Sequence, residues 1–279
     1  FALLIGVNGY KDRNFGQLRY CAADVQALAG VLRHVGYDPI VTLHDEETRR
    51  DRQPTRDNLE AELEGVCRAV REPDLLWVHF SGHGRLVERE GQREPVLLTQ
   101  EIRIQTASKA LPLATVEQMM KGSGARRLFL TIDACQAGVS GRAAAAAEFV
   151  EFLRDRAWGF ALLAASTSEQ AALEWGDRQH GLFTYYVLEG LSGKAARPGE
   201  EVVTVAGLAD YVQGCVVSWA LEQGFDQSPT KQIEGFGDMV LADFRERGRP
   251  VWSPGQAAPS PSPEMSRQVA PRRSRSGGT

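Results

Sequence analysis

Short apolar runs rich in aliphatic residues alternate with segments of helical periodicity along most of this chain of 279 residues. This alternation is typical of a parallel β-sheet whose two faces are both covered by helices. It therefore predicts an α/β fold. The predicted strands are residues 2–7, 39–43, 75–80, 127–132 and 159–165, and the predicted helices are residues 18–36, 54–71, 183–191 and 205–221.

Residues 89–111 interrupt the alternation. Gly91 and Pro95 punctuate the segment, and Val96-Leu97-Leu98 is long enough for a short strand. Because Gly and Pro favour turns, we predict a hairpin or a long loop here.

The composition changes at about Arg249, and almost no large apolar residue follows Trp252. A segment of this kind cannot bury enough surface to offset the entropy lost on ordering. We therefore predict one folded domain at residues 1–248 and a disordered linker or tail rich in Pro, Ser and Arg at 249–279. The chain opens on Phe1 without an initiator Met, so we expect it to be part of a longer multidomain protein.

The charge distribution argues against a nucleic-acid partner. The net charge is −4, and residues 249–279 carry five arginines against one glutamate, which leaves about −8 on residues 1–248. Binding to phosphates needs a basic face. No apolar run approaches the ~18 residues of a membrane helix, so we expect a soluble, cytoplasmic protein without a membrane partner. Four widely spaced cysteines form no C-x-x-C pair, which favours a reducing compartment over a zinc site or a disulfide framework.

Two predicted strands are followed by unusual polar segments. Ser81-Gly82-His83-Gly84 follows the strand at 75–80, and Asp133-Ala134-Cys135-Gln136-Ala137-Gly138 follows the strand at 127–132. Taken alone, His83 could be a turn residue whose imidazole caps a carbonyl, and Cys135 a buried structural thiol. Functional crevices of parallel sheets lie at the carboxyl ends of their strands. If the two strands are neighbours, one crevice holds an imidazole able to activate a thiol.

These segments resemble the caspase-like peptidases of the caspase and metacaspase group, particularly its bacterial members. The His83-to-Cys135 separation of 52 is close to the roughly 50 residues of caspases, and Asp133, two residues before the Cys, matches the metacaspase form. The resemblance implies a caspase–hemoglobinase fold, with a mostly parallel six-stranded sheet flanked by helices on both faces. It spans roughly residues 2–234 and includes the segments 2–8, 18–24, 80–84, 164–174 and 181–186.

The resemblance also implies a mechanism for protein or peptide substrates. Cys135 would attack the scissile carbonyl, and His83 would serve as general base and acid. The backbone N–H groups of Gly84 and Cys135 would hold the oxyanion. No third carboxylate is evident, and the family generally works as a dyad without a cofactor.

In the metacaspase pattern two acidic residues line the pocket for the residue before the cut, and they match Asp24 and Asp133. Two carboxylates in a narrow cleft favour Arg or Lys. A pocket for Asp would need arginines, and Arg19 is the only nearby candidate. The structural alternative for Asp24 is a solvated helix residue, and Asp133 too could be structural. The pattern also places Cys21 at the pocket wall and Ser166 where the family contacts an extended peptide.

Two further expectations concern activation. Residues 96–120 offer only Glu101 and Glu117 as acids, and 138–147 offer none, so we expect no calcium or other metal site. Some relatives cleave themselves after a basic residue in a loop that follows the nucleophile, and Arg142 is the candidate here. Metacaspases are usually monomeric, so we expect a monomer.

Two alternatives remain at this point. The first is a catalytically silent caspase-fold interaction module, which loss of either dyad residue would signal. The second is another cysteine-nucleophile hydrolase, such as an amidotransferase. Such an enzyme normally has its His downstream of the Cys, whereas here His83 precedes Cys135.

Overall fold

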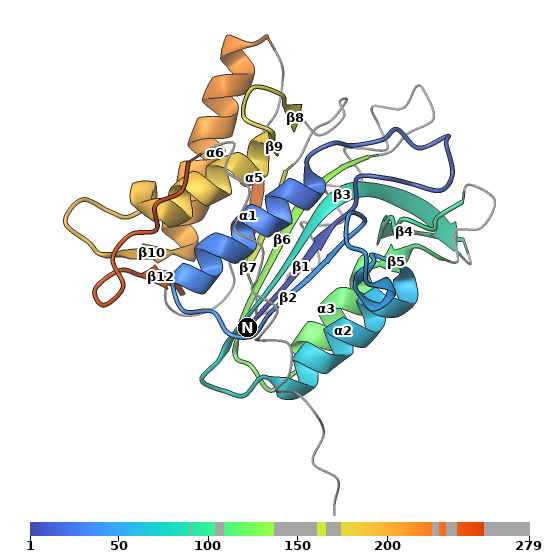
Figure 1. The fold of residues 1–279 in the computed structure, drawn as a ribbon, viewed down its shortest axis with the longest axis horizontal. Coiled ribbons are helices and arrows are strands. Elements are labelled where there is room, and N and C mark those ends of the chain that lie inside the picture. The colour runs from blue at the N-terminus through green and yellow to red at the C-terminus, as the bar shows by residue number, and fades with distance from the viewer. Residues whose placement is uncertain are drawn as a thin grey trace, which may run out of the picture.

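The computed structural model describes residues 1–89, 91–103, 109–136, 161–165, 174–224, 229–232 and 239–253. Its main sheet has a six-stranded path in the order β11-β7-β6-β3-β1-β2 (Figure 1). The five strands from β7 to β2 pair in parallel, and β11 is antiparallel to β7. The predicted mostly parallel sheet is confirmed, with six strands on its main path and two further strands attached to one side, eight in all. Its strands are β1 (Ala2–Gly6), β2 (Ile40–His44), β3 (Leu75–Arg89), β6 (Arg127–Gln136), β7 (Ala161–Ala164) and β11 (Thr230–Gln232).

Strands β3 and β6 are longer than predicted. We expected them to end at Phe80 and Ile132, but β6 pairs with β3 as far as the Gly84–Gln136 position. From Gly84 to Arg89, β3 also pairs with the antiparallel strand β4 (Gln92–Leu97), which in turn pairs with β5 (Leu111–Pro112). The polar segments 81–84 and 133–136, which we expected just after the strands, therefore lie within the sheet, where neighbouring strands continue to satisfy their backbone groups.

Helices cover both faces of the sheet (Figure 1). On one face α2 (Arg56–Ala69) and α3 (Leu113–Lys121) enclose an apolar core, and on the other face α1 (Cys21–His34), α5 (Leu182–Glu189) and α6 (Val205–Glu222) enclose a second. Alternate residues of β3 supply both cores: Leu76 and Val78 face the first, while Leu75 and Trp77 face the second. Helix α3 was not predicted, whereas the start of α2 was: the Thr55 side chain caps it by accepting from the Asn58 N–H.

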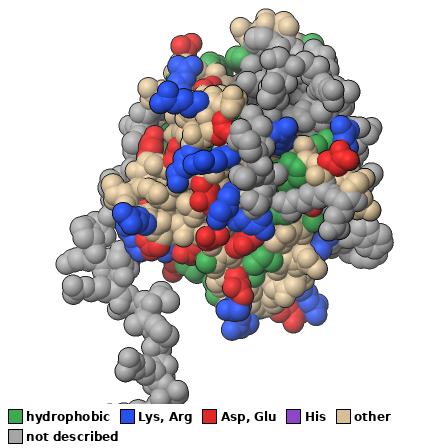
Figure 2. Space-filling model, turned by 90° about the vertical axis from the view of Figure 1, so that its right-hand side faces the viewer, with side chains coloured by type: hydrophobic (Ala, Val, Ile, Leu, Met, Phe, Trp, Pro, Cys, Tyr) green, Lys and Arg blue, Asp and Glu red, His purple; other side chains and the backbone are tan. Residues whose placement is uncertain are grey.

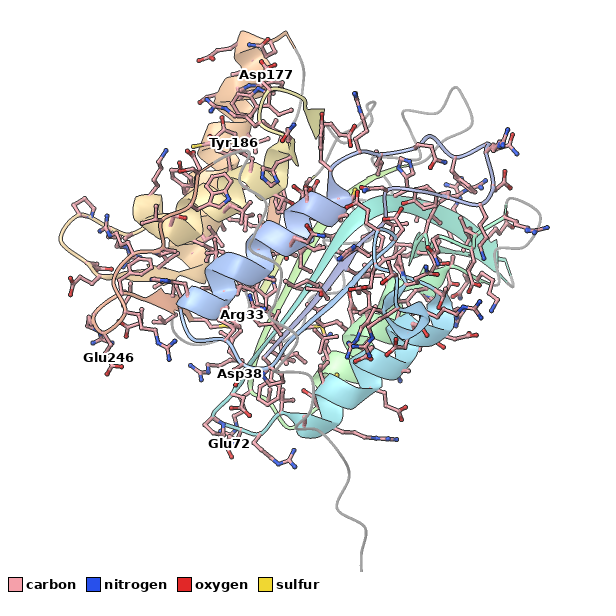
Figure 3. The ribbon with its side chains drawn as sticks, in the orientation of Figure 1. Arg33, Asp38, Glu72, Asp177, Tyr186 and Glu246 are labelled. Atoms are coloured by element: carbon pink, nitrogen blue, oxygen red, sulfur yellow. The ribbon has the colours of Figure 1, made fainter. Side chains whose placement is uncertain are left out.

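Short elements complete the described chain. They are η1 (Arg50–Arg52), β8 (Glu174–Trp175), β9 (His180–Gly181), η3 (Gly190–Lys194), β10 (Val202–Thr204) and β12 (Val240–Asp243). Strands β8 and β9 form a small antiparallel hairpin, and its turn carries the exposed Asp177 at the outer edge of the molecule (Figure 3). None of the helices in the described ranges is both long and apolar enough to cross a membrane.

One face mixes charges of both signs among its described side chains (Figure 2). Many of the charges on α2 are paired, as in the ion pairs Arg56–Glu60, Arg52–Glu62 and Lys109–Asp57. This mixture differs from the basic stripe of a nucleic-acid-binding surface. The expected lack of a nucleic-acid partner stays a prediction.

The chain remains packed on the domain at residue 252. The Trp252 ring lies 5.2 Å from the ring of Tyr185 and 5.7 Å from that of His180, measured between centroids. We expected the tail to start at 249, and this part of it contacts the fold. Residues 254–279 lie outside the described residues, so the domain boundary stays a prediction.

Candidate active site

The sheet brings His83 and Cys135 to neighbouring positions. Residue 83 of β3 and residue 135 of β6 are register partners in the parallel pair, and Ser81 and Asp133 are partners two positions earlier. Adjacent strands lie roughly 4.8 Å apart, so the two residues are separated by about one strand spacing. For Cys135 only the backbone belongs to the described part. The backbones of the two polar segments therefore lie side by side, as expected.

The His83 imidazole is buried and held by a segment that follows β1. Its Nε2 lies 2.9 Å from the carbonyl oxygen of Gly16. A carbonyl only accepts, so Nε2 carries the proton and Nδ1 is the basic nitrogen of the neutral ring. The contact matches the structural alternative, in which the imidazole caps a carbonyl. The same hydrogen bond also leaves Nδ1 unprotonated, and a general base needs an unprotonated nitrogen.

Tyr10 supports His83 from two directions. Its ring stacks on the imidazole with centroids 5.0 Å apart, and its hydroxyl accepts the His83 backbone N–H at 2.7 Å. A Cβ on Gly82 would lie 2.9 Å from the Phe80 ring and 3.0 Å from the Tyr10 hydroxyl, which explains a glycine inside this strand. Neither Tyr10 nor Gly16 was singled out from the sequence. A backbone carbonyl has no residue signature, so only the fold could reveal the Gly16 contact.

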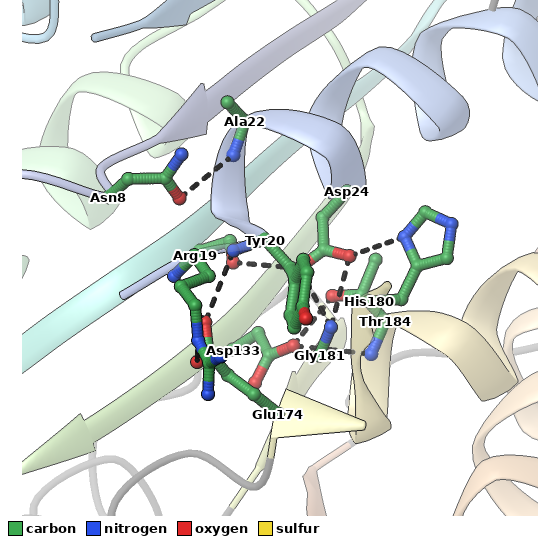
Figure 4. Close-up of polar contacts among 11 residues, drawn as sticks. Asn8, Arg19, Tyr20, Ala22, Asp24, Asp133, Glu174, His180, Gly181 and Thr184 are labelled. Carbon is green, nitrogen blue, oxygen red and sulfur yellow. Dashed lines mark hydrogen bonds and ion pairs between the residues drawn. The ribbon is translucent and has the colours of Figure 1, made fainter. Parts of the chain in front are cut away.

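Beside the dyad lies a narrow acidic pocket, and Figure 4 shows the polar contacts of its carboxylates Asp24, Asp133 and Glu174. It brings together Asp24, Asp133 and Cys21, the three described residues predicted to line it, and adds a third carboxylate, Glu174. Its interior space of about 10 Å³ has room for roughly one water molecule. The remaining lining residues are Leu18, Tyr20, Ser81 and Gly181.

Asp24 is only 1% exposed, so its interpretation as a solvated helix residue is wrong. Its Oδ1 accepts from His180 Nδ1 at 2.8 Å and from the Gly181 N–H at 3.2 Å. The Ser81 hydroxyl donates to its Oδ2 at 3.2 Å. These donors come from β9 and β3, so the carboxylate of α1 is fixed from both sides of the pocket.

Asp133 is 3% exposed and lies across the pocket from Asp24. Its Oδ2 accepts from the Thr184 hydroxyl at 2.7 Å and from the Thr184 N–H at 3.2 Å. A Cβ on Gly181 would approach Asp133 Oδ2 to 2.7 Å and Asp24 Oδ2 to 3.1 Å. Glycine is therefore needed where β9 passes between the two carboxylates.

Burial dominates the electrostatics of this pocket. It raises the pKa of Asp24, against the lowering effect of the bonds from His180, Gly181 and Ser81. Burial and the nearby Asp24 charge raise the pKa of Asp133 to about 7, against the lowering effect of the Thr184 bonds. Burial, followed by the Asp24 charge, also raises the pKa of the Cys21 thiol. An incoming cation would offset the cost of ionising these carboxyls.

Glu174 closes the rim of the pocket. It accepts the backbone N–H groups of Arg19 and Tyr20, the latter at 3.1 Å, and its Oε2 lies 3.4 Å from Arg19 Nε. The Arg19 side chain is 74% exposed and is absent from the pocket lining. The arginine that an Asp-selective pocket would need therefore points to solvent, paired with Glu174.

Two predicted site residues lie outside the described residues, namely Ser166 and the self-cleavage candidate Arg142. Within the described ranges no group of three or more His, Cys, Asp and Glu side chains is arranged to hold a metal ion. The expected lack of a metal site stays a prediction for the whole chain.

Comparison with known proteins places the chain in a family. The chain is 41% identical over 85 residues to metacaspase-1 of Mycosarcoma maydis and 38% identical over 86 residues to metacaspase-1 of Debaryomyces hansenii. Each match covers 30% of this chain and about a fifth of the relative, 21% and 19% respectively.

The likeness to solved structures extends over most of the chain. A Geobacter sulfurreducens protein matches with a TM-score of 0.58 at 16% identity, over 89% of this chain and 98% of its own. Caspase-1 of Spodoptera frugiperda matches with a TM-score of 0.55 at 11% identity, over 88% and 90%. These likenesses confirm the predicted caspase–hemoglobinase fold. Residues 1–236 match the family described as the caspase domain, and the chain belongs to that family.

Proposed function

We propose that this chain is a cysteine endopeptidase that cleaves proteins after Arg or Lys, with Cys135 as nucleophile and His83 as general base and acid. The observation that carries the proposal is the register of β3 and β6, which makes residues 83 and 135 direct neighbours. Membership of the caspase-domain family agrees with this chemistry. The fixed tautomer of His83 supports it further, since a base must present an unprotonated nitrogen.

The chemistry proceeds in two halves. The Cys135 thiol gives its proton to His83 Nδ1, and the sulfur attacks the scissile carbonyl carbon. The N–H groups of Gly84 and Cys135 stabilise the resulting oxyanion. His83 then protonates the leaving amine, the C–N bond breaks, and a thioester remains. Water, deprotonated by His83, attacks the thioester carbonyl carbon, the C–S bond breaks to release the acid product, and His83 returns the proton to the Cys135 sulfur. The Gly16 carbonyl orients the ring throughout and stabilises the imidazolium.

The preference for Arg or Lys rests on the acidic pocket. Asp24, Asp133 and Glu174 meet there, and charge-assisted hydrogen bonds to carboxylates are among the strongest in proteins. A guanidinium can bind two carboxylate oxygens at once, whereas an aspartate side chain would meet only like charge. The space of about 10 Å³ is far too small for an arginine side chain, so we expect its lining to move on binding.

We further propose that the protein works as a monomer in a reducing, cytoplasmic environment. Cys21, Cys67 and Cys215 are free thiols, which agrees with such a compartment. Light scattering of the purified protein would test the monomer, because a mass of twice the chain would contradict it. Mapping the ends of any fragments, with Arg142→Ala as the comparison, would test self-cleavage after Arg142.

The proposed activity can be tested with fluorogenic peptides that differ only in a terminal Arg, Lys or Asp. Wild type, Cys135→Ala and His83→Ala would be assayed with and without calcium. We expect cleavage after Arg or Lys, loss of activity in both variants and no effect of calcium. Cleavage after Asp would contradict the assigned pocket. If folded wild type cleaves none of the peptides, the result would favour the interaction-module alternative.

A further inference from the structure

We propose that His180 is a positioning residue of the acidic pocket, which holds Asp24 oriented and anionic so that the pocket accepts a basic side chain. This inference rests on the proposed cleavage after Arg or Lys. It concerns a residue outside the dyad, on the short strand β9 at the end of a hairpin.

The geometry ties His180 directly to the pocket. His180 is 4% exposed, and its Nδ1 lies 2.8 Å from Asp24 Oδ1. The next residue, Gly181, directs its N–H at both oxygens of the same carboxylate, at 3.2 and 3.3 Å. Two consecutive residues of β9 thus donate hydrogen bonds to one carboxyl group (Figure 4). A carboxylate accepts only, so Nδ1 is the protonated nitrogen of the ring in this contact.

The position of His180 is itself fixed. It is the register partner of Trp175 in the β8–β9 hairpin, while Gly181 is the partner of Glu174. Trp252 packs on the ring with a centroid distance of 5.7 Å and an interplanar angle of 55°. A short hairpin and a tryptophan from the far end of the chain therefore hold the imidazole against Asp24. A ring supported in this way keeps its hydrogen bond without large motions of the side chain.

The two aspartates are held differently. Asp133 receives its bonds from the neutral Thr184, whereas Asp24 receives one from an ionisable imidazole. The other titratable groups that line the pocket with Asp24 are Cys21 on its own helix, Tyr20 just before that helix, Asp133 on β6 and Glu174 on β8, the last paired with Arg19. Among the described side chains in hydrogen-bond contact with Asp24, His180 is the basic one.

This contact opposes the effect of burial. Burial raises the pKa of Asp24, and the hydrogen bond from His180 is the largest opposing influence. Without that bond the pKa of Asp24 would rise further, so the carboxyl would take up a proton at a higher pH. The nearby Asp133 would then lose the Asp24 charge that helps raise its own pKa. The two groups would tend to share one negative charge, and a basic side chain would bind less tightly.

The test combines a direct titration with kinetics. In a Cys135→Ala background, carboxyl-labelled ¹³C NMR would follow the Asp24 midpoint, which Asp24→Asn identifies. We expect His180→Ala to raise that midpoint by about one unit or more. His180→Asn, whose amide N–H can replace Nδ1–H, should bring it back towards wild type. His34→Ala, at an exposed histidine remote from the pocket, should leave it unchanged.

In the active enzyme, His180→Ala should lower kcat/KM for the Arg peptide by ~10- to 100-fold at pH 7, mainly through KM. The acidic limb of its pH profile should move to higher pH, and His180→Asn should recover most of the loss. Should the Ala variant fail to fold, His180→Phe, which keeps a ring beneath Trp252, carries the same test.

Failure of this inference is distinguishable from failure of the proposed function. An Asp24 midpoint that is unchanged in folded His180→Ala or His180→Phe would overturn the role of His180, even if wild type cleaves after Arg. Wild type that cleaves only after Asp would overturn the proposed specificity, while the NMR titration would still decide whether His180 holds Asp24 ionised.

Discussion

The Asp133 carboxyl is buried, so its ionisation destabilises the fold while it adds negative charge to the pocket. Burial and the Asp24 charge raise its pKa from 3.8 to about 7. A carboxyl whose pKa is raised in the folded state binds its proton more tightly there than in the unfolded state. Its contribution to stability is therefore largest when it is protonated, and is lost as the pH rises from about 4 through about 7.

The first prediction follows from that linkage. At pH 8 Asp133→Asn should raise the free energy of unfolding by on the order of 2 kcal/mol, because the neutral amide avoids a buried charge. The same variant should lose most cleavage after Arg. Denaturant unfolding at pH 5 and pH 8 measures the first effect, and the gain should shrink at the lower pH. A variant that is destabilised at both pH values would contradict the assigned burial cost.

The second prediction concerns Tyr10, whose hydroxyl accepts the buried N–H of His83. Tyr10→Phe should cost about 1–3 kcal/mol of stability, since the N–H loses that acceptor, and should lower kcat by disturbing His83. Tyr37→Phe is a matched control, because the Tyr37 hydroxyl donates to the Leu241 carbonyl far from the dyad. It should reduce stability without changing kcat. Equal kcat in both variants would argue against a supporting role for Tyr10.

At the scale of elements, the pairing of two sheet strands fixes the relative positions of the two dyad residues. Strands β3 and β6 pair over ten consecutive positions, from Leu75–Arg127 to Gly84–Gln136, so His83 and Cys135 share the rigidity of the sheet. Sites on strands are held more precisely than sites on loops. The hairpin β8–β9 adds the groups that face Asp24.

The third prediction tests the close packing within β3. Gly82→Ala should cost about 1–3 kcal/mol of stability and reduce activity, because the new Cβ would press on Phe80 and Tyr10. Gly65→Ala is the comparison: Gly65 lies in α2 with nothing within 4 Å of a Cβ, so alanine should stabilise by about 0.5–1 kcal/mol. Thermal unfolding and the Arg-peptide assay measure both variants. Unchanged stability and activity in Gly82→Ala would contradict this close packing, because Phe80 and Tyr10 would then have room to move away from the new Cβ.

The sequence predicted the element types well where apolar periodicity was strong, as for β1, β2 and α6. It ended β3 and β6 too early, because glycines and polar residues there satisfy side-chain and packing needs rather than forming turns. Asp24, Asp133 and Cys21 could be placed in one pocket from the resemblance to the metacaspase pattern. The Gly16 carbonyl and His180 could not, since their roles depend on contacts across 67 and 156 residues of chain.

At the scale of the whole molecule, distant parts of the chain converge at one end of the sheet. The segment after β1, the ends of β3 and β6, the β8–β9 hairpin and Trp252 all contribute contacts there. Two separate cores, one on each face, support this arrangement. The site therefore depends on residues from near both ends of the described chain.

The fourth prediction tests the part played by the C-terminal segment. A chain ending at residue 253 should keep full activity, whereas a chain ending at 248 loses the Trp252 contacts with His180 and Tyr185. The shorter chain should be less stable by about 1–3 kcal/mol and have a higher KM for the Arg peptide. Unfolding and steady-state kinetics measure both effects. Identical stability and kinetics of the two chains would show that residues 249–253 belong functionally to the tail.

The central claim is that Cys135 is the nucleophile of an Arg- or Lys-directed peptidase. The most direct measurement is to treat the protein with matched peptidyl chloromethyl ketones that end in arginine or aspartate, whose chloride leaves as the sulfur–carbon bond forms, and to map the stable adduct by mass spectrometry. The account predicts a single adduct on Cys135, formed by the arginyl compound and absent with the aspartyl compound. Labelling of Cys21, Cys67 or Cys215 instead, or preferential reaction with the aspartyl compound, would contradict it.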